Sequence, residues 1–173
     1  MDEQVKGAAA AAAPGAIAAA ATAPEAAAAL CGPYPELLLD NQLCFPLYAA
    51  SRAITRRYTP LLRELDLTYT QYITMMALWE RDGVTVNELG GRLFLDSGTL
   101  TPLLKKLEGR GLIVRARDAD DERRVIVSLT DEGRGLRERA ATVPLAMMGC
   151  LDLEPADAQE LKRLLGKVLA GLS

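Results

Sequence analysis

Histidine is absent from this chain of 173 residues, and the absence narrows the chemistry that the protein can perform. Without histidine, neither a Cys-His pair nor a Ser-His-Asp triad can form. The side chain that most often binds transition metals is missing as well. The 3 cysteines do not include a CxxC pair, so the sequence contains no zinc motif. We therefore expect neither a bound metal nor a cofactor.

A net positive charge is also lacking. The net charge is −3, so any binding to nucleic acid must come from a local basic surface. No stretch is long and apolar enough to predict a membrane span. The alanine-rich N-terminus is unlike a signal peptide, because Asp2 and Glu3 outweigh Lys6 where an early positive patch is needed. The odd number of cysteines does not fit a secreted disulfide scaffold. We predict a cytoplasmic protein with no membrane partner.

The composition changes after residue 33. Residues 1–33 are mostly alanine, proline and glycine, which bury little apolar area, so we predict a disordered or partly helical tail. Residues 34–173 are predicted to form one domain. Over the whole chain, 50% of the residues are hydrophobic and 25% are charged, which is typical of a globular protein.

Apolar residues at helical spacing predict a mainly α-helical fold. Asp40 is expected to cap a first helix, and Pro46 implies that this helix either begins close to Cys44 or kinks there. Thr85 and Glu88 have the spacing of a capping box. The other predicted helices cover residues 60–65, 70–80, 85–93, 97–111, 130–150 with a bend at Pro144, and the segment from Pro155 onward.

A small β-hairpin is predicted between the helices. Residues 112–117 and 124–129 are short runs with β-branched residues, and the charged segment between them is typical of a turn. Two short helices followed by such a hairpin form a winged helix-turn-helix, in which the second helix enters the major groove of double-stranded DNA. The predicted fold class is therefore mainly α with a small β-wing.

Hydroxyl and basic side chains gather on the second helix and on the wing. The helix carries Ser97, Thr99, Thr101, Lys105 and Lys106, and the wing carries Arg115, Arg117, Arg123 and Arg124. Hydroxyls reach base edges or phosphates, and lysines neutralise phosphates. An arginine at a wing tip suits the narrow minor groove. Each charge alone is more simply a solvated surface, but their order along the chain favours DNA binding.

Cys44 is the candidate reactive group. It lies near the start of a predicted helix, and tyrosines follow at Tyr48, Tyr58, Tyr69 and Tyr72. Phenol hydroxyls can donate hydrogen bonds to a thiolate and so favour its charged, nucleophilic form. A buried structural cysteine is an equally good reading of these residues, because free cysteine is among the most buried residue types.

Three separated motifs resemble one family. Residues 95–108 (LDSGTLTPLLKKLE) resemble the recognition-helix region of MarR-type repressors. Asp121-Glu122-Arg123, with residues 128–133 (SLTDEG), is similar to the wing and exit of that family. Leu43-Cys44-Phe45, with the tyrosines that follow, is similar to its organic-hydroperoxide-sensing branch, OhrR. The resemblance covers residues from about 40 to 170, and Pro46 is a departure from the branch.

The resemblance implies an intertwined homodimer held by its first and last helices. It implies that Cys44 is the peroxidatic cysteine, and that Tyr58 and Tyr69 donate hydrogen bonds to its thiolate. It also implies that Asp121 braces the wing and that Arg123 enters the minor groove. The expected function is that of a repressor that leaves its operator DNA when an organic hydroperoxide oxidises Cys44.

The roles of the other two cysteines are interpreted from the residues and from the resemblance. From the residues alone, Cys150 is best explained by core packing. One class of OhrR carries a second cysteine in this region, so the resemblance implies that Cys150 resolves oxidised Cys44 by an intersubunit disulfide. Cys31, at the boundary of the tail, is expected to be incidental, although it remains the alternative resolving thiol.

Three other functions stay open at this point. The first is a MarR-type repressor that senses a phenolic or drug-like ligand, with a merely structural Cys44. The second is a thiol peroxidase, against which no electron-donor motif is visible and the wing arginines would be idle. The third and weakest is a protein-interaction module. We expect a regulator rather than an enzyme.

Overall fold

The structure is a computed structural model that describes residues 34–172. The predicted tail over residues 1–33 and Cys31 lie outside the described residues. The chain divides into two units, one up to Leu47 and one from Tyr48 onward. Among the described residues, no helix combines the length and apolar character needed to span a bilayer.

Two short 3-10 helices precede the first long helix. They are η1 (Pro35–Leu37) and η2 (Leu39–Asn41). The Asn41 side-chain amide donates to the Pro35 carbonyl at 2.8 Å, which ties η2 back to η1. Asp40 lies inside η2, so its predicted role as the cap of the long helix is wrong. That helix begins only at Cys44, four residues after Asp40.

Helix α2 (Cys44–Arg63) is one helix of 20 residues that contains two prolines. Pro46 is its third residue, where a backbone amide has no acceptor within the helix. The helix therefore begins at Cys44, one of the two alternatives predicted. The separate helix predicted over residues 60–65 is wrong, because α2 continues through Pro60. That proline removes a single amide donor near the helix end, where fully buried Leu62 anchors the last turn.

Three helices form the helix-turn-helix region, α3 (Tyr69–Glu80), α4 (Val86–Leu93) and α5 (Ser97–Gly109). Helices α3 and α4 each begin at a complete capping box, and the box predicted at Thr85 is confirmed. Gly111 follows α5 with a φ of 72°, a left-handed conformation that glycine adopts without strain.

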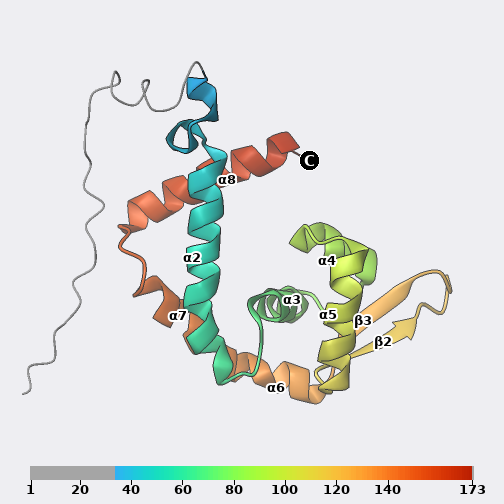
Figure 1. Cartoon of the computed structure of the whole chain (residues 1–173). Helices are drawn as coiled ribbons and strands as arrows, with labels where there is room; N and C mark the ends of the chain where they lie inside the picture. Colours follow the sequence, from blue (N-terminus) through green and yellow to red (C-terminus); the bar gives the residue numbers. More distant parts are fainter. Residues whose placement is uncertain (1–33, 173) are drawn as a thin grey trace, which may run out of the picture. The chain divides into compact units, whose positions relative to one another are not determined.

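The sheet has three antiparallel strands in the order β1-β3-β2. Strands β2 (Ile113–Arg117) and β3 (Val125–Leu129) form the predicted hairpin, with Ile113 opposite Leu129. Strand β1 (Val84–Thr85) is not predicted from the sequence, because a strand of 2 residues has no detectable alternation. The fold is thus mainly α with a small β-wing, as predicted (Figure 1).

The segment after the wing is divided into three helices, α6 (Asp131–Ala140), α7 (Thr142–Met148) and α8 (Pro155–Leu172). The predicted single helix over 130–150 with a bend at Pro144 is wrong, because the chain breaks before that proline. Pro144 cannot donate to the carbonyl four residues earlier, and its ring crowds that position. Helix α6 accordingly ends at Ala140, and Pro144 lies in the first turn of α7.

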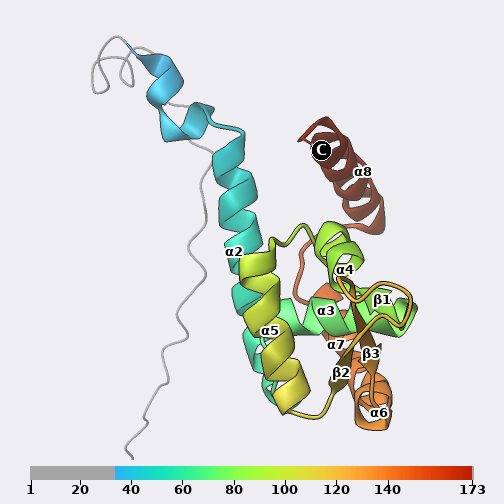
Figure 2. The same ribbon diagram turned by 90° about the vertical axis from the view of Figure 1, so that its right-hand side faces the viewer.

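The core lies between α3, α4, α5, the sheet and α6, and Figures 1 and 2 show these elements gathered beside one another. Helix α6 is joined to this core by polar contacts as well as by packing. The Trp79 indole donates to the Gly133 carbonyl at 2.8 Å. The Asp82 carboxylate accepts from the Leu129 amide at 2.8 Å and from the Arg134 guanidinium at 2.6 Å.

We expect Gly133→Ala to destabilise the fold strongly. A Cβ at this position would lie 1.9 Å from the Leu112 carbonyl oxygen, so α6 must move away from the chain at Leu112, the residue before β2. The free energy of unfolding should fall by about 2–3 kcal/mol or more. Urea denaturation of the variant measures the change.

Gly135→Ala is the matched control, because it lies in the same helix with no atom within 4 Å of the added Cβ. It should raise the free energy of unfolding by about 0.5–1 kcal/mol, since alanine is the better helix former. Equal effects of the two substitutions would contradict the close approach of Gly133 to the Leu112 carbonyl.

Candidate nucleic-acid interface and reactive thiols

The outward face of α5 is set by the face that it buries. Leucines 100, 103, 104 and 107 are all buried in the core. Thr101 and Lys105 lie on the opposite side and are exposed. They are therefore exposed to a partner that contacts this helix, and their contact with DNA stays a prediction.

Ser97 and Thr99 stand at the first turn of α5. The Asp96 carboxylate accepts from the Thr99 amide at 2.9 Å and from its hydroxyl at 3.0 Å. Hydrogen bonds from Thr99 lower the pKa of Asp96, which remains a charged cap. The Thr99 hydroxyl thus takes part in holding the start of the helix, whereas Ser97 is exposed beside it.

The wing tip is built around two aspartates. The Asp121 carboxylate accepts from the Arg123 amide at 3.0 Å, and its carbonyl accepts from the Arg124 amide at 2.9 Å. Asp118 pairs with the Arg124 guanidinium at 3.7 Å. Asp121 therefore orders the turn, and the Arg123 guanidinium has no carboxylate partner within residues 34–172.

Arg115 is engaged in a different way. Its guanidinium donates to the Glu108 carboxylate at 2.5 and 3.1 Å, and its backbone amide donates to the same carboxylate at 3.2 Å. This arrangement lowers the pKa of Glu108. The pair joins the end of α5 to the first wing strand. Arg115 was predicted to bind DNA, and its pairing favours a role in positioning the wing.

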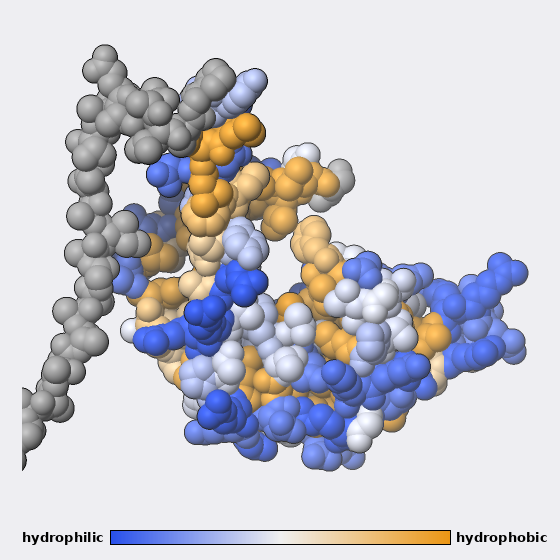
Figure 3. Space-filling view, in the orientation of Figure 1, coloured by the Kyte–Doolittle hydropathy of each residue, from blue (hydrophilic) through white to orange (hydrophobic). Residues whose placement is uncertain are grey.

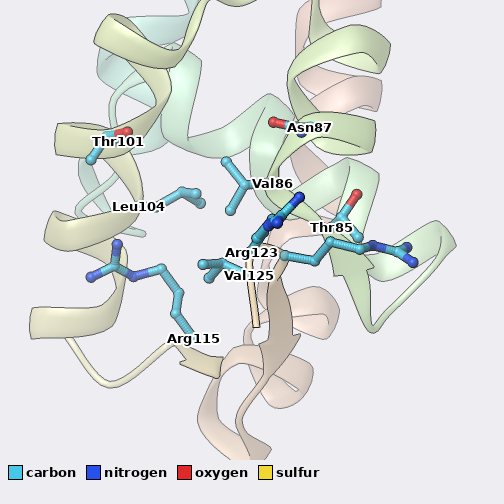
Figure 4. Close-up of a pocket in the computed structure, with 9 residues that line it drawn as sticks. Thr85, Val86, Asn87, Thr101, Leu104, Arg115, Arg123 and Val125 are labelled. Atoms are coloured by element: carbon cyan, nitrogen blue, oxygen red, sulfur yellow. The ribbon is translucent and has the colours of Figure 1, made fainter. Parts of the chain in front are cut away.

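A hollow of about 290 Å³ lies between α4, α5 and the wing. Thr101, Arg115 and Arg123 line it, together with Asn87 of α4 (Figure 4). The structure therefore brings together residues from the helix and the wing that were predicted separately. Lys106 is not among them, because it lines a second hollow on the other flank of α5.

The predicted tyrosine pair is in contact. The rings of Tyr58 and Tyr69 have centroids 4.9 Å apart, and Tyr72 lies 5.9 Å from Tyr58. Burial, and then the neighbouring Tyr69, raise the pKa of Tyr58. A tyrosine hydroxyl carries its proton at neutral pH and can donate a hydrogen bond to an anion, and this shift moves the ionisation of Tyr58 further from neutral pH.

Cys44 and Cys150 are both exposed, so neither packs in the chain's own core. Cys44 is the first residue of α2 and belongs to the unit that ends at Leu47. Cys150 follows α7 in the other unit, and its thiol donates to the Ala146 carbonyl at 3.4 Å. The reading of Cys150 as a core residue is therefore wrong.

Glu108 is a site residue that was not predicted from the sequence. The sequence pattern that could have indicated it is an acidic residue at the end of a basic helix, seven positions before an arginine in a predicted strand. Such a spacing predicts contact only once the tight turn at Gly111 is known. Within the described residues, no three acidic or cysteine side chains group as metal ligands would.

Comparison with known proteins gives relatives of one kind. The model of the transcriptional regulator SarA/Rot family matches residues 56–139. The organic hydroperoxide resistance transcriptional regulator of Bacillus subtilis (strain 168) is 45% identical over 139 residues, which cover 80% of this chain and 95% of that protein. These relatives are transcriptional regulators and not enzymes.

The solved structures agree with this. AbfR of Staphylococcus epidermidis is 38% identical, with a TM-score of 0.64, over 78% of this chain and 92% of that one. Reduced AbfR bound to DNA matches with a TM-score of 0.68 at 36% identity, over 78% of this chain and 92% of that one. AbfR with its disulfide formed matches with a TM-score of 0.53 at 37% identity, over 78% and 89% of the two chains.

We expect Arg123→Ala to weaken DNA binding and to make the plot of log K against log salt shallower by about one unit, because a phosphate or minor-groove contact is lost. Arg115→Ala should weaken binding while the slope stays unchanged, since its charge is already paired with Glu108. Titrations of a duplex from the promoter of the chain's own gene, at several salt concentrations, measure both.

Glu108→Gln distinguishes a wing-positioning role of Arg115 from a phosphate-binding role, because the two roles predict opposite changes in the affinity for DNA. If Arg115 positions the wing, loss of the carboxylate weakens DNA binding. If Arg115 contacts a phosphate, the same change removes a repelling charge and frees the guanidinium, so binding becomes tighter. A tighter complex would contradict the positioning role.

Proposed function

Because this chain belongs to the MarR-type winged-helix regulators, in the branch of the organic hydroperoxide resistance transcriptional regulators, we propose that it represses transcription until an organic hydroperoxide oxidises Cys44. The chain is a DNA-binding transcriptional regulator, as its relatives are. The observation that carries the redox proposal is the exposure of Cys44 at the first residue of α2. A cysteine that stabilised the chain's own core would be buried there, so the Cys44 thiol is left for reaction or for contact with a second subunit.

The proposed chemistry begins at the Cys44 sulfur. The thiolate attacks one peroxide oxygen, an S–O bond forms as the O–O bond breaks, and the alkoxide leaves as an alcohol after taking up a proton. Sulfur is oxidised to a sulfenic acid. The Cys150 thiol of a second subunit then attacks that sulfur, and a disulfide forms as water leaves. Both thiols are exposed, as this sequence of steps requires.

Tyr58 and Tyr69 are proposed to stabilise the Cys44 thiolate. Their rings lie in contact, and a phenol hydroxyl is protonated at neutral pH and can donate a hydrogen bond; the raised pKa of Tyr58 moves its ionisation further from neutral pH. The family resemblance is what assigns these tyrosines to Cys44, across the interface between subunits.

A homodimer is proposed from the surface of α8. No residue of this helix is buried within the chain, although an apolar stripe runs along it. Leu161, Leu164, Leu165 and Val168 are 36–45% exposed. Figure 3 shows hydrophobic residues toward the C-terminal end of α8. Such a stripe is stable in water only when another surface covers it, and a second copy is the partner that the resemblance implies.

Oxidation is proposed to release DNA by changing the dimer. The two cysteines of a disulfide must bring their Cα atoms within about 7 Å. Movement of Cys150 toward a partner's Cys44 shifts the recognition helices away from neighbouring major grooves, which lie about 34–36 Å apart. Disulfide-formed AbfR matches this chain with a TM-score of 0.53 and reduced, DNA-bound AbfR with 0.68, which supports a difference in the shape of the single AbfR chain between those two structures.

We expect Cys44→Ser to bind the promoter duplex like the parent and to keep it when an organic hydroperoxide is added. Serine preserves the size of the side chain, but its hydroxyl is not ionised near neutral pH. A gel shift with and without cumene hydroperoxide tests this, with Cys31→Ser as the control that still releases DNA. Release from Cys44→Ser at the parental peroxide concentration would remove the sensor role and favour a ligand-sensing regulator.

The Cys150 prediction concerns the cross-link. Peroxide should convert the parent to a dimer that survives a non-reducing denaturing gel and separates on reduction, because a nearby thiol captures the sulfenic acid before further oxidation. Cys150→Ser should lose this dimer and accumulate sulfinic acid at Cys44, seen by mass spectrometry. A cross-link that persists in Cys150→Ser but disappears in Cys31→Ser would transfer the resolving role to Cys31.

A further inference from the structure

Helix α2 has an unusual charge. Among its 20 residues are Arg52, Arg56, Arg57 and Arg63, and none is acidic. The chain as a whole carries a net charge of −3, so this positive charge is concentrated locally. A helix of one sign attracts an anionic partner, and the apolar contacts proposed for dimerisation do not account for it.

Three of these arginines share one face of the helix. Arg56 and Arg63 follow Arg52 by four and eleven positions, which places all three within about 40° of one another around an α-helix. Arg57 points about 100° away from Arg56, since successive residues of a helix differ by that angle. We call Arg52, Arg56 and Arg63 the arginine stripe.

The stripe leads to the recognition helix. One hollow is lined by Arg52, Arg56 and Thr59, and the neighbouring hollow by Thr59, Arg63 and Lys106 of α5. Thr59 belongs to both, so the basic surface continues from α2 onto α5. Lys106 lies on the flank of α5 that does not face the wing, since the hollow beside the wing is lined by Thr101 instead. Hydrophilic residues cover part of α2 in Figure 3.

The charges around the stripe leave its arginines available. Asp66 is the acidic residue in the second hollow, and its carboxylate pairs with Arg110 at 3.4 Å. Arg52 lies over the Tyr48 ring at 5.6 Å, a contact that leaves its positive charge uncompensated. Within residues 34–172, Arg56, Arg63 and Lys106 form no ion pair with a carboxylate. Exposed hydroxyls and unpaired cations side by side are typical of phosphate contacts.

We propose that the arginine stripe, with Lys106, binds the sugar-phosphate backbone of operator DNA on the side of α5 away from the wing. A helix in the major groove, about 12 Å wide, has a phosphate backbone on each side. The wing arginines contact the phosphate backbone on one side of the major groove, and the arginine stripe contacts the backbone on the other side. The proposal rests on the proposed DNA-binding role of α5. It adds α2 to the DNA contact, beyond the helix and the wing.

The test compares neighbouring arginines. Arg56→Gln and Arg63→Gln should each make the plot of log K against log salt shallower by about 0.9 for a labelled promoter duplex. Arg57→Gln removes the same charge from the same helix and should leave the slope unchanged. A scrambled duplex of equal length should show the same pattern, because phosphate contacts carry no sequence information.

Two further measurements decide between partners. If the stripe instead pairs with acidic residues of a second copy, Arg56→Gln weakens the dimer in sedimentation while the salt slope at saturating dimer stays parental, and the proposal is overturned. Equal slopes for Arg56→Gln and Arg57→Gln overturn it too. Arg123→Ala keeps this failure separate from that of the proposed function, because its slope still falls if only the stripe assignment is wrong.

Discussion

The close approach of α6 to the wing sheet is the constraint on which the rest of the structure depends. Gly133 lies against the Leu112 carbonyl with no room for a side chain. Thr130 adds a hydrogen bond from its hydroxyl to the Gly111 carbonyl at 2.6 Å and one from its amide to the Leu112 carbonyl at 3.1 Å. The hairpin, the end of α5 and the start of α6 are therefore held together at one corner, where α6 connects the wing to the segment that carries Cys150.

That corner gives the proposed redox response a physical route. Asp82 accepts from the Leu129 amide at the end of β3 and from the Arg134 guanidinium of α6, so independent movement of the wing and α6 breaks one half-buried and one exposed hydrogen bond. Over residues 141–172 no side chain makes such a polar contact with the sheet, although Val143 packs in the core, and the break between α6 and α7 lies there. A displacement of Cys150 therefore has two possible effects. Either the chain bends at the break between α6 and α7, or α6 and the wing move together with Cys150.

Local signals explain most of what could be predicted from the sequence. The capping box at Thr85, the hairpin and the glycine that ends α5 all depend on residues within a few positions of one another, and all three are confirmed. The effect of proline on the helix boundaries was overestimated. Pro60 was taken as a helix start and Pro144 as a bend, but the first is tolerated near a helix end and the second lies in a first turn.

The rest of the site needed three-dimensional information. Glu108 meets Arg115 only because the chain reverses at Gly111, and Lys106 is separated from Thr101 only by the rotation of α5. The arginines of α2 were visible in the sequence, but their relation to α5 was not. The electrostatic pattern is therefore a property of the fold: an acidic chain presents several basic surfaces around one helix.

Trp79, the single tryptophan of the chain, lies at the junction of α3 and α6. The ring centroids of Trp79 and Tyr72 lie 6.5 Å apart in an edge-on arrangement, and the indole N–H of Trp79 donates a hydrogen bond to the Gly133 carbonyl. The emission of an indole depends on its hydrogen bonding and on the polarity around it. The protein consequently contains its own optical probe of the contact between α6 and the helix-turn-helix core. The fluorescence of the unlabelled chain reports whether that contact survives when peroxide or DNA is added.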